Sequence, residues 1–395
     1  MSVFASFALG PAIVGGLLTL VLSLVLPFVV RPLLVKLGIM DVPNERSSHE
    51  RPVLRGLGLA VLIAIAIGGG FAVAITAQVG IPMLGWNLLL AVLVGSLLAG
   101  LLGLGEDLRG VSVKVRSVLL LLIGLLVPVT LVWLFNAGKQ SGDFGFVGAS
   151  GGFGHRLPAG WFDEVGSAVM LSAEPVGAVP LPLWAGIVLV PYGVLFISSY
   201  INVANFMDGL NGISGFHGVI AGLTFAAAGW FSGLSWLFTM SLVLAAGFLG
   251  FLPWNLSRRG AFLGDVGSYL LGGAVAITSF AALLAGVPIL ATIGPMIIYF
   301  GDVGVTLVKR VRAGHKWDEP HKEHVYQRLN QLGLSHVAAS GVTALFTLAA
   351  SVLGLASLFV TPIWWLLLLA LGLALVVLYI RMPRLLGRRA GSTSH

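Results

Sequence analysis

The chain has 395 residues, of which 57% are hydrophobic and only 9% are charged, and its mean hydropathy is +1.01. Soluble domains carry about 25% charged residues, so this composition excludes an ordinary soluble protein and predicts an all-α, polytopic helix bundle in a membrane. The lack of cysteine excludes disulfides and thiolate metal sites. We expect one membrane domain over residues 1–395.

Eleven apolar runs are long enough to cross a bilayer as helices, which takes about 20 residues. They lie at about 11–35, 57–78, 86–104, 117–137, 182–200, 214–232, 235–254, 268–285, 288–308, 337–358 and 361–380. No basic residue precedes Arg31, so the first run is predicted to be a permanent helix and not a signal peptide.

The basic residues fall almost entirely on one side of these runs. If the N-terminus is outside, the inside gaps hold 20 of the 22 Lys and Arg residues, and only Lys139 and Arg156 lie outside, in a Gly-rich loop at about 138–181. The positive-inside rule therefore predicts an outside N-terminus and a cytoplasmic C-terminus with a basic tail at 381–395. The net charge of +7 then reflects topology and needs no nucleic-acid partner.

Two cytoplasmic loops follow the first and third runs. The first contains Asp41-Val-Pro-Asn-Glu-Arg-Ser-Ser-His49 and reaches Arg55, and its basic residues are either membrane anchors or contacts for a phosphate. The second begins with Glu106-Asp107. One acid there could pair with Arg109, but two adjacent carboxylates repel each other, and a bound cation relieves that repulsion. We therefore favour a functional role for the acid pair.

Asn202, Asn205 and Asp208 follow the fifth apolar run at intervals of three residues. If the helix continues through them, they lie within an arc of about 120° and face one cavity. A helix cap would use one such residue and not all three. Asn211, beyond a glycine, is a further candidate for the same cavity.

Two further acids lie near the cytoplasmic ends of later runs. Asp265 lies between Gly264 and Gly267, which let a backbone approach a ligand closely, although a turn with a capping Asp has the same pattern. Asp302 lies inside the ninth run. An acid at that depth is a functional candidate by default, and the alternative is a structural partner of Lys309 or of a neighbouring helix.

The last cytoplasmic loop, at about 309–336, is predicted to hold a helix that starts at Asp318 and ends at Gly333. In that helix, an arc of about 60° holds three polar side chains, His321, His324 and Arg328. This pattern predicts an amphipathic helix on the membrane surface with an anion-binding edge. Zinc is less favoured, because no cysteine and no third histidine lies nearby.

The cytoplasmic loops together suit phosphate chemistry. Hard oxygen ligands favour Mg²⁺, which takes one or two carboxylates and leaves positions for water and phosphates, and Arg and His suit a pyrophosphate. This combination predicts phosphoryl transfer between a soluble nucleotide and a membrane lipid, a reaction that depends on positioning and charge neutralisation. The alternative is a transporter or flippase that uses Asp302 for coupling, although the sequence shows no paired broken helices in corresponding halves.

These motifs resemble those of the polyprenyl-phosphate N-acetylhexosamine-1-phosphate transferases, which form a superfamily with the phospho-N-acetylmuramoyl-pentapeptide transferases. The resemblance is carried by Asn202-x-x-Asn205-x-x-Asp208-Gly, Phe262-Leu-Gly-Asp265-Val-Gly-Ser, Glu106-Asp107 before Leu-Arg-Gly-x-Ser, and His321-x-x-His324-x-Tyr-Gln-Arg328. The loop from Asp41 to His49 is also similar, so the resemblance runs in order from about residue 40 to 335.

The resemblance implies transfer of a sugar-1-phosphate from a UDP-sugar to undecaprenyl phosphate, with release of UMP and with Mg²⁺ or Mn²⁺ as the cofactor. It implies an enzyme of the inner membrane whose active site faces the cytoplasm, of the type that starts O-antigen or exopolysaccharide chains. A homodimer is a candidate assembly.

The motifs and the resemblance together give the predicted site. Catalytic roles are predicted for Asp107, Asp208 and Glu106, and metal binding is predicted for Asp265 and Asn205. The predicted substrate-binding residues are Asn202, Arg55, His321, His324 and Arg328.

The chain departs from the family's pattern at two notable positions. Glu106 replaces the usual first aspartate of the acid pair, which changes its reach, and Asn211 stands where many members have a second aspartate. Asp107, Asp208 and Asp265 are all kept, so an active enzyme is predicted.

Overall fold

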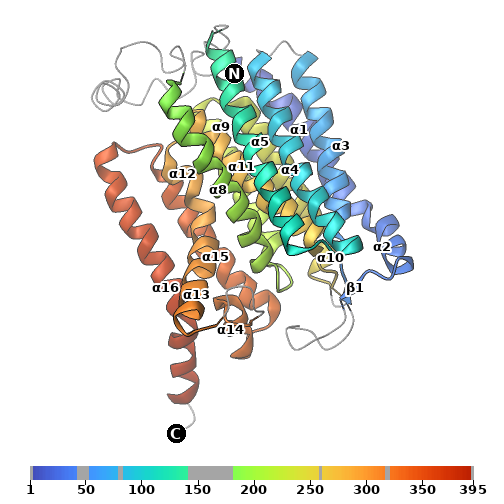
Figure 1. Ribbon diagram of the computed structural model, residues 1–395, viewed down its shortest axis with the longest axis vertical. Coiled ribbons are helices and arrows are strands. Elements are labelled where there is room, and N and C mark those ends of the chain that lie inside the picture. The colour runs from blue at the N-terminus through green and yellow to red at the C-terminus, as the bar shows by residue number, and fades with distance from the viewer. Residues whose placement is uncertain are drawn as a thin grey trace.

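The computed structural model describes residues 3–41, 53–78, 83–140, 181–257, 260–315 and 321–392 (Figure 1). Its helices and strands are α1 (Val3–Val25), α2 (Pro27–Lys36), β1 (Met40–Asp41), β2 (Val53–Leu54), α3 (Gly58–Gln78), α4 (Met83–Arg109), α5 (Val113–Gln140), α8 (Leu183–Met207), α9 (Ile213–Ser232), α10 (Ser235–Asn255), α11 (Gly264–Leu284), α12 (Ile289–Ile293), η2 (Gly294–Met296), α13 (Ile297–Arg312), α14 (Val325–Gln331), α15 (His336–Ala356), η3 (Pro362–Trp364) and α16 (Trp365–Ser392).

The prediction of an all-α membrane bundle is confirmed. Eleven helical segments in the described ranges are long and apolar enough to cross a membrane, which matches the eleven apolar runs of the sequence. The strands in those ranges are limited to the two-residue pair β1 and β2. The marked chain ends lie at opposite ends of the bundle in Figure 1, as an odd number of crossings requires.

Two of the predicted spans are interrupted at prolines. The run at 11–35 is divided, because α1 ends at Val25 and α2 begins at Pro27, whose ring cannot continue the α-helical hydrogen-bond ladder. Figure 1 shows α2 beside the lower end of the bundle. The run at 288–308 consists of α12, a short 3₁₀ turn that contains Pro295, and α13.

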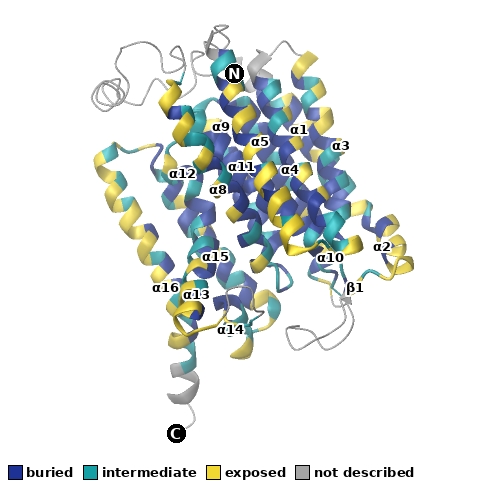
Figure 2. Ribbon diagram, in the orientation of Figure 1, coloured by how far each residue is buried: buried dark blue, intermediate teal, exposed yellow. Residues whose placement is uncertain are grey.

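Helix α11 lies at the centre of the bundle and carries Asp265 in its first turn. Of its membrane-spanning window, 94% of the residues are buried (Figure 2). Glycines let its backbone meet two neighbouring helices. A Cβ at Gly103 of α4 would lie 2.1 Å from the Asp265 carbonyl oxygen, and one at Gly272 would lie 2.6 Å from Ile201 Cα of α8. The packing therefore brings the ends of α4, α8 and α11 together.

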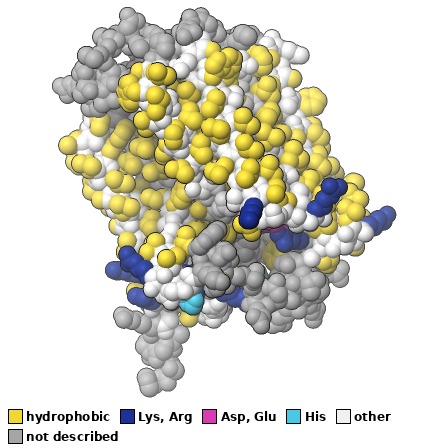
Figure 3. Space-filling model, viewed as in Figure 1, with side chains coloured by type: hydrophobic (Ala, Val, Ile, Leu, Met, Phe, Trp, Pro, Cys, Tyr) yellow, Lys and Arg dark blue, Asp and Glu magenta, His cyan; other side chains and the backbone are white. Residues whose placement is uncertain are grey.

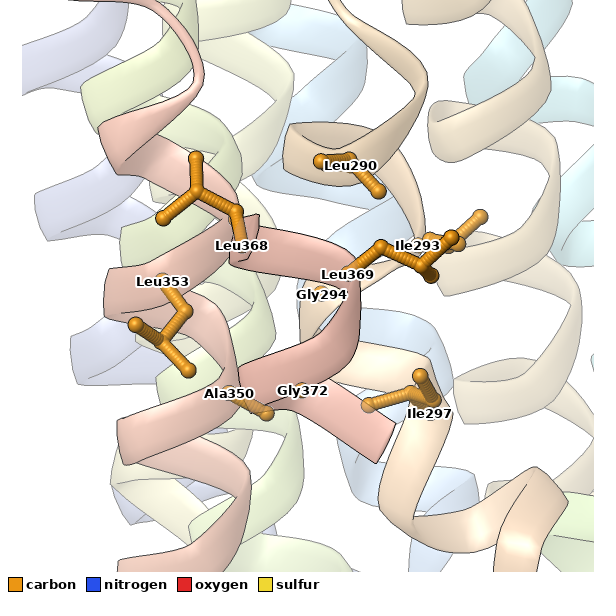
Figure 4. A pocket seen from close by; sticks show the side chains of 10 residues that line it. Leu290, Ile293, Gly294, Ile297, Ala350, Leu353, Leu368, Leu369 and Gly372 are labelled. Carbon is orange, nitrogen blue, oxygen red and sulfur yellow. The ribbon is translucent and has the colours of Figure 1, made fainter. Parts of the chain in front are cut away.

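Helix α16 is the opposite case. Only 17% of its membrane-spanning window is buried, and Figure 2 shows it as a mostly exposed helix at the side of the bundle. Where it meets α12 and α15, a crevice of about 20 Å³ is lined by aliphatic side chains and glycines, including Leu290, Gly294 and Leu369 (Figure 4). This lining has no group that could take part in acid–base chemistry or bind a metal.

Some sequence predictions fall outside the described residues. These are the loop from 42 to 52, which includes Arg46 and His49, most of the predicted Gly-rich loop, residues 141–180, and the predicted helix start at Asp318. The prediction of one domain over residues 1–395 stays a prediction.

Candidate active site

The candidate site begins with a backbone junction between the loop that precedes α3 and the segment that precedes α11. Leu54 forms a parallel bridge with Ala261, and the Phe262 amide donates to the Leu54 carbonyl at 2.8 Å. The Gly58 amide donates to the Leu263 carbonyl at 2.8 Å. These bonds hold the intervening Arg55 next to the first turn of α11.

Glycine is required at the centre of this junction. Gly264 has a φ of +76°, and a Cβ there would lie 2.7 Å from both Gly56 Cα and Asp107 Oδ2. Any other residue would meet both the strain of a left-handed backbone and a collision. The loop, the end of α4 and the start of α11 are therefore in van der Waals contact.

Arg55 binds two of the predicted acids at once. One guanidinium nitrogen donates to Asp265 Oδ2, and Nε lies 3.0 Å from Asp107 Oδ1. The Val266 amide donates to the other oxygen of Asp107 at 2.8 Å. The Asp107 side chain is 1% exposed and that of Asp265 is 16% exposed. Two acids that are 158 residues apart in the sequence thus share one cationic group.

The polar residues of α8 have different partners. Asn205 Nδ2 donates to Asp265 Oδ1 at 2.8 Å and to Ser268 Oγ at 3.0 Å, so Asn205 binds one of the two acids. Asn202 Nδ2 donates instead to the Ser198 carbonyl of its own helix at 2.9 Å. We use the name carboxylate cluster for Arg55, Asp107, Asn205 and Asp265.

Asp208 lies just beyond the end of α8. Its backbone angles, φ −86° and ψ 60°, are not helical, so the helical arc that the sequence predicted stops before it. Its Oδ1 accepts a hydrogen bond from Ser214 Oγ at 2.6 Å. Burial raises the pKa of Asp208 to about 7, the Ser214 hydroxyl opposes this rise, and the charges of Asp265 and Asp107 add to it. Asp208 is therefore electrostatically coupled to the carboxylate cluster.

Glu106 does not share a cation with its neighbour Asp107. Its Oε1 lies 2.7 Å from an Arg116 guanidinium nitrogen, and its Oε2 accepts a hydrogen bond from the Tyr269 hydroxyl at 2.9 Å. The two adjacent acids thus have separate partners, and Glu106 pairs with Arg116 and not with Arg109, which was the alternative partner that the sequence offered. Tyr269 was not singled out by sequence reasoning, although it directly follows the Asp265 motif.

The predicted helix over residues 318–333 is wrong in its first part. Residues 321–324 are not helical, and α14 begins only at Val325, with His324 as its N-cap. The physical reason is the Asp302 carboxylate, which accepts hydrogen bonds from the Val325 amide and His324 Nδ1 and so fixes the helix start. His321 and His324 therefore do not share a helical face with Arg328.

His321, His324 and Arg328 differ in burial and in the groups around them. His324 is buried, whereas the His321 ring is partly exposed, and the two ring centres are 4.8 Å apart. Burial, followed by the charges of His324 and Arg310, lowers the pKa of His321 to about 4, so its imidazole is neutral at pH 7. Arg328 lines a cavity of about 110 Å³ between α13, α14 and α16, together with Lys309.

Tyr326 connects this segment to the end of α8. It is 1% exposed, and its hydroxyl donates to the Phe206 carbonyl at 3.0 Å. A Cβ at Gly209 would lie 2.4 Å from the same hydroxyl oxygen. We use the name histidine segment for residues 321–331. This segment is therefore in direct contact with the end of α8 and the turn that follows it. Tyr326 is part of the quoted His-x-x-His-x-Tyr pattern but was not among the predicted site residues.

The residues of the carboxylate cluster fit a hard divalent cation. No group of three or more His, Asp and Glu side chains in the described ranges is arranged to hold a metal. Magnesium, however, commonly takes one or two carboxylates and completes its shell with water and substrate phosphates. Asp107 and Asp265 already face one cationic group, the guanidinium of Arg55. Two carboxylates that converge on one cation match that requirement.

Basic side chains gather at the same end of the molecule. On the face shown in Figure 3, Lys and Arg lie below a broad apolar band. Arg55 and Lys309 belong to the segments at that end, as do Arg116 and Arg328. The fold and site thus define a multi-pass membrane protein with an acidic cluster surrounded by cations, a combination suited to phosphate groups.

Comparison with known proteins supports the same family. Residues 89–283 match the model of glycosyl transferase family 4. A probable undecaprenyl-phosphate N-acetylglucosaminyl 1-phosphate transferase of Bacillus subtilis (strain 168) is 26% identical over 327 residues, which are 82% of this chain and 78% of that protein.

Two further relatives come from different branches. A decaprenyl-phosphate N-acetylglucosaminephosphotransferase of Mycolicibacterium smegmatis is 28% identical over 334 residues, 78% of this chain and 72% of that protein. A phospho-N-acetylmuramoyl-pentapeptide-transferase of Clostridium botulinum is 28% identical over 182 residues, 44% of this chain and 52% of that protein.

The family match and the relatives confirm the resemblance that the motifs suggested. The chain is similar to the superfamily of polyprenyl-phosphate N-acetylhexosamine-1-phosphate transferases and phospho-N-acetylmuramoyl-pentapeptide transferases, and these matches support that superfamily. It is a multi-pass membrane transferase, and these relatives favour that reading over a transporter.

Proposed function

We propose that the protein transfers a sugar-1-phosphate, of the N-acetylhexosamine type, from a UDP-sugar to undecaprenyl phosphate and releases UMP. A phosphate oxygen of the lipid attacks the phosphorus that carries the sugar. The bond from that phosphorus to the UMP oxygen breaks, and a lipid-linked pyrophosphate forms. The acceptor phosphate has a second pKa of about 6, so it is mostly ionised at neutral pH and needs little help from a general base.

The observation that carries the proposal is the meeting of three separate sequence motifs at Arg55. Its guanidinium contacts Asp107 from the end of α4 and Asp265 from the start of α11, and Asn205 of α8 binds the same Asp265 carboxylate. A transporter needs no such convergence of hard oxygen ligands and a guanidinium at one end of the bundle. A reaction between two phosphate groups needs both.

The residues have separate roles in this proposal. Asp265 and Asn205, with Asp107 beside them, would hold Mg²⁺ or Mn²⁺, which when bound neutralises charge on the phosphates. Arg55 then turns from the acids toward the donor's phosphate oxygens. Asp208 orients the acceptor phosphate. Glu106 is held by Arg116 and Tyr269, so we assign it to fixing the end of α4 and not to the reacting groups.

Other groups contact the donor from the histidine segment. His321 donates one N–H to the donor's phosphate as a neutral imidazole. Arg328, which the sequence assigned to the donor, lines the cavity on the Asp302 side of α14, so we give it no contact with the phosphates. His324, which the sequence assigned to the donor, is buried against Asp302, so we assign it to holding this segment. Asn202 bonds its own helix and is the weakest of the predicted substrate contacts.

We also propose that the site faces the cytoplasm of the inner membrane, where nucleotide sugars are made. The support is the positive-inside rule, because the segments around the site carry most of the basic residues. The product would begin a cell-surface polysaccharide, such as an O-antigen or exopolysaccharide.

A direct assay tests the function. Purified protein is incubated with undecaprenyl phosphate and a panel of UDP-N-acetylhexosamines, and UMP release is followed with and without EDTA. We expect UMP release with at least one donor, loss of release with EDTA, and recovery when Mg²⁺ or Mn²⁺ is added in excess. No metal-dependent UMP release with any donor would count against the proposal.

A further inference from the structure

Asp302 is a fully buried carboxylate in α13 that neither the reaction nor the carboxylate cluster uses. Its side chain is 0% exposed. It accepts hydrogen bonds from the Val325 amide at 3.0 Å, His324 Nδ1 at 3.1 Å, the Tyr379 hydroxyl at 3.0 Å and Thr306 Oγ1 at 3.3 Å. With four donors around it, the carboxylate is committed to holding structure.

These donors come from three different elements. Thr306 is one turn away on α13, His324 and Val325 form the start of α14, and Tyr379 belongs to α16. The bond to the Val325 amide caps α14, and the bond to Nδ1 fixes the tautomer and the orientation of the His324 ring. Asp302 therefore joins the cytoplasmic histidine segment to two membrane-spanning helices.

The other side of α14 faces the site. The Tyr326 hydroxyl donates to the Phe206 carbonyl at 3.0 Å, and Phe206 lies two residues before Asp208. The His324 and Tyr326 rings are stacked, with centres 5.8 Å apart and planes 8° apart. A change at Asp302 can thus be transmitted through two packed rings to the backbone beside Asp208.

We propose that Asp302 is the positioning residue that holds residues 321–331 against the active site, so that His321 meets the phosphates of the nucleotide-sugar donor. This inference rests on the proposed function. Asp302 touches neither substrate; it acts through the start of α14 and through the His324 ring. Loss of its charge or geometry should weaken donor binding and leave the chemistry of the carboxylate cluster intact.

Kinetics of two variants test the proposal. Asp302→Asn turns an amide N–H₂ toward groups that are themselves donors, so we expect the KM for the donor to rise about tenfold or more. The kcat and the KM for undecaprenyl phosphate should change by less than about threefold. Tyr379→Phe removes one donor from a helix outside the catalytic residues and should raise the donor KM by roughly threefold.

A matched control separates positioning from general loss of a buried polar group. Ser351 is a buried residue of α15 whose hydroxyl bonds only to its own helix, at the Thr347 carbonyl. Ser351→Ala should leave both KM values unchanged. If Asp302→Asn and Tyr379→Phe lower kcat without raising the donor KM, the proposal is overturned, and Tyr379→Phe decides the matter if Asp302→Asn does not fold.

A distance measurement tests the anchor without any activity. The chain has no cysteine, so spin labels can be attached at Leu332→Cys after α14 and at Lys114→Cys on α5, both of which are exposed positions. We expect one narrow distance distribution in the otherwise unchanged protein and a broader one in Asp302→Asn. An unchanged distribution would overturn the anchor. The protein without the Asp302 substitution could prove inactive while the distance distribution still broadens in Asp302→Asn. That result would count against the proposed function but would support the role of Asp302 in holding the histidine segment.

Discussion

The carboxylate cluster and the histidine segment lie at the same end of the bundle but are held in different ways. The cluster is fixed by backbone contacts, with glycines at 56, 103 and 264 that allow three elements to touch. The histidine segment is fixed by side chains, chiefly the four hydrogen bonds to Asp302 and the Tyr326 bond to α8. In the proposed function, the reacting groups would therefore lie on rigid backbone packing, and the groups that bind the donor would depend on side-chain contacts that single substitutions can loosen.

The largest effect is expected at the cluster itself. Asp265→Asn removes a charge that binds Arg55 and that would hold the metal, so kcat should fall on the order of 10²–10³-fold. The variant should still fold, because the amide keeps the shape of the side chain. UMP release and a thermal unfolding midpoint measure the two quantities. Near-full turnover would remove Asp265 from the site.

Substitution of a junction glycine tests whether the cluster depends on backbone contact. Gly264→Ala places a Cβ 2.7 Å from Asp107 Oδ2, whereas Gly286→Ala, at a similar φ of +86°, meets nothing within 4 Å. Both variants carry left-handed strain of about 1–2 kcal/mol. Only Gly264→Ala should add an overpacking cost of about 1–3 kcal/mol and lose most activity. Equal unfolding midpoints for the two would refute the close contact.

The histidine segment should respond in donor affinity. His321→Asn removes the partly exposed imidazole, so the donor KM should rise about tenfold while kcat stays within about threefold. Because the pKa of His321 is lowered to about 4, this effect should be constant between pH 6 and pH 8. A fall in kcat of the size expected for Asp265→Asn would mean that the two regions are not functionally separate.

Glu106 offers a smaller test within the cluster's surroundings. Glu106→Gln keeps a hydrogen-bond acceptor for Tyr269 and loses the ion pair with Arg116. Since we assign no contact with the reacting groups, activity should fall less than about tenfold. Asp107→Asn, assayed beside it, should lose far more. Equal losses of activity in Glu106→Gln and Asp107→Asn would show that Glu106 is a catalytic residue, as the sequence predicted.

The smallest effect is expected at Ser214. Its hydroxyl stabilises the ionised form of Asp208, whose pKa is about 7. In Ser214→Ala the carboxylate loses that bond, so its pKa rises further and the protonated form persists to higher pH. The acid limb of kcat/KM should move up by roughly 0.5–1 pH unit. An unchanged limb would show that ionisation of Asp208 does not control the rate.

Much of the fold could be predicted because lipid imposes simple rules. Span length predicted eleven crossings, and the described residues contain eleven helical segments long and apolar enough to cross a membrane. The positions at which an apolar run is divided into two helices were harder to predict, because a proline kinks some helices and ends others. Pro27 begins a new helix, whereas Pro128 lies inside the continuous α5. Local sequence does not distinguish these outcomes, since they depend on what the freed carbonyl meets in the bundle.

For the candidate site, the sequence predicted which residues of the carboxylate cluster lie together better than it predicted how they pair. Asp107, Asn205 and Asp265 do meet, as their motifs suggested, but Arg55 was placed with the substrate and lies between the acids. The start of α14 was missed because its determinant, Asp302, is 23 residues earlier in the chain. Helix caps are predicted from residues that are adjacent in the sequence, whereas the residue that caps α14 belongs to another helix, α13.

The junction at Gly264 also sets an order for biosynthesis. Arg55 pairs with an acid 210 residues further along the chain, and translation at about 5–20 residues per second needs roughly 10–40 s to cover that distance. During that interval, the first loop lacks its second acidic partner. The membrane helices before α11 can all insert correctly and still form no carboxylate cluster. Assembly of this cluster is therefore completed by α11, which has to pack between α4 and α8 after both have been made.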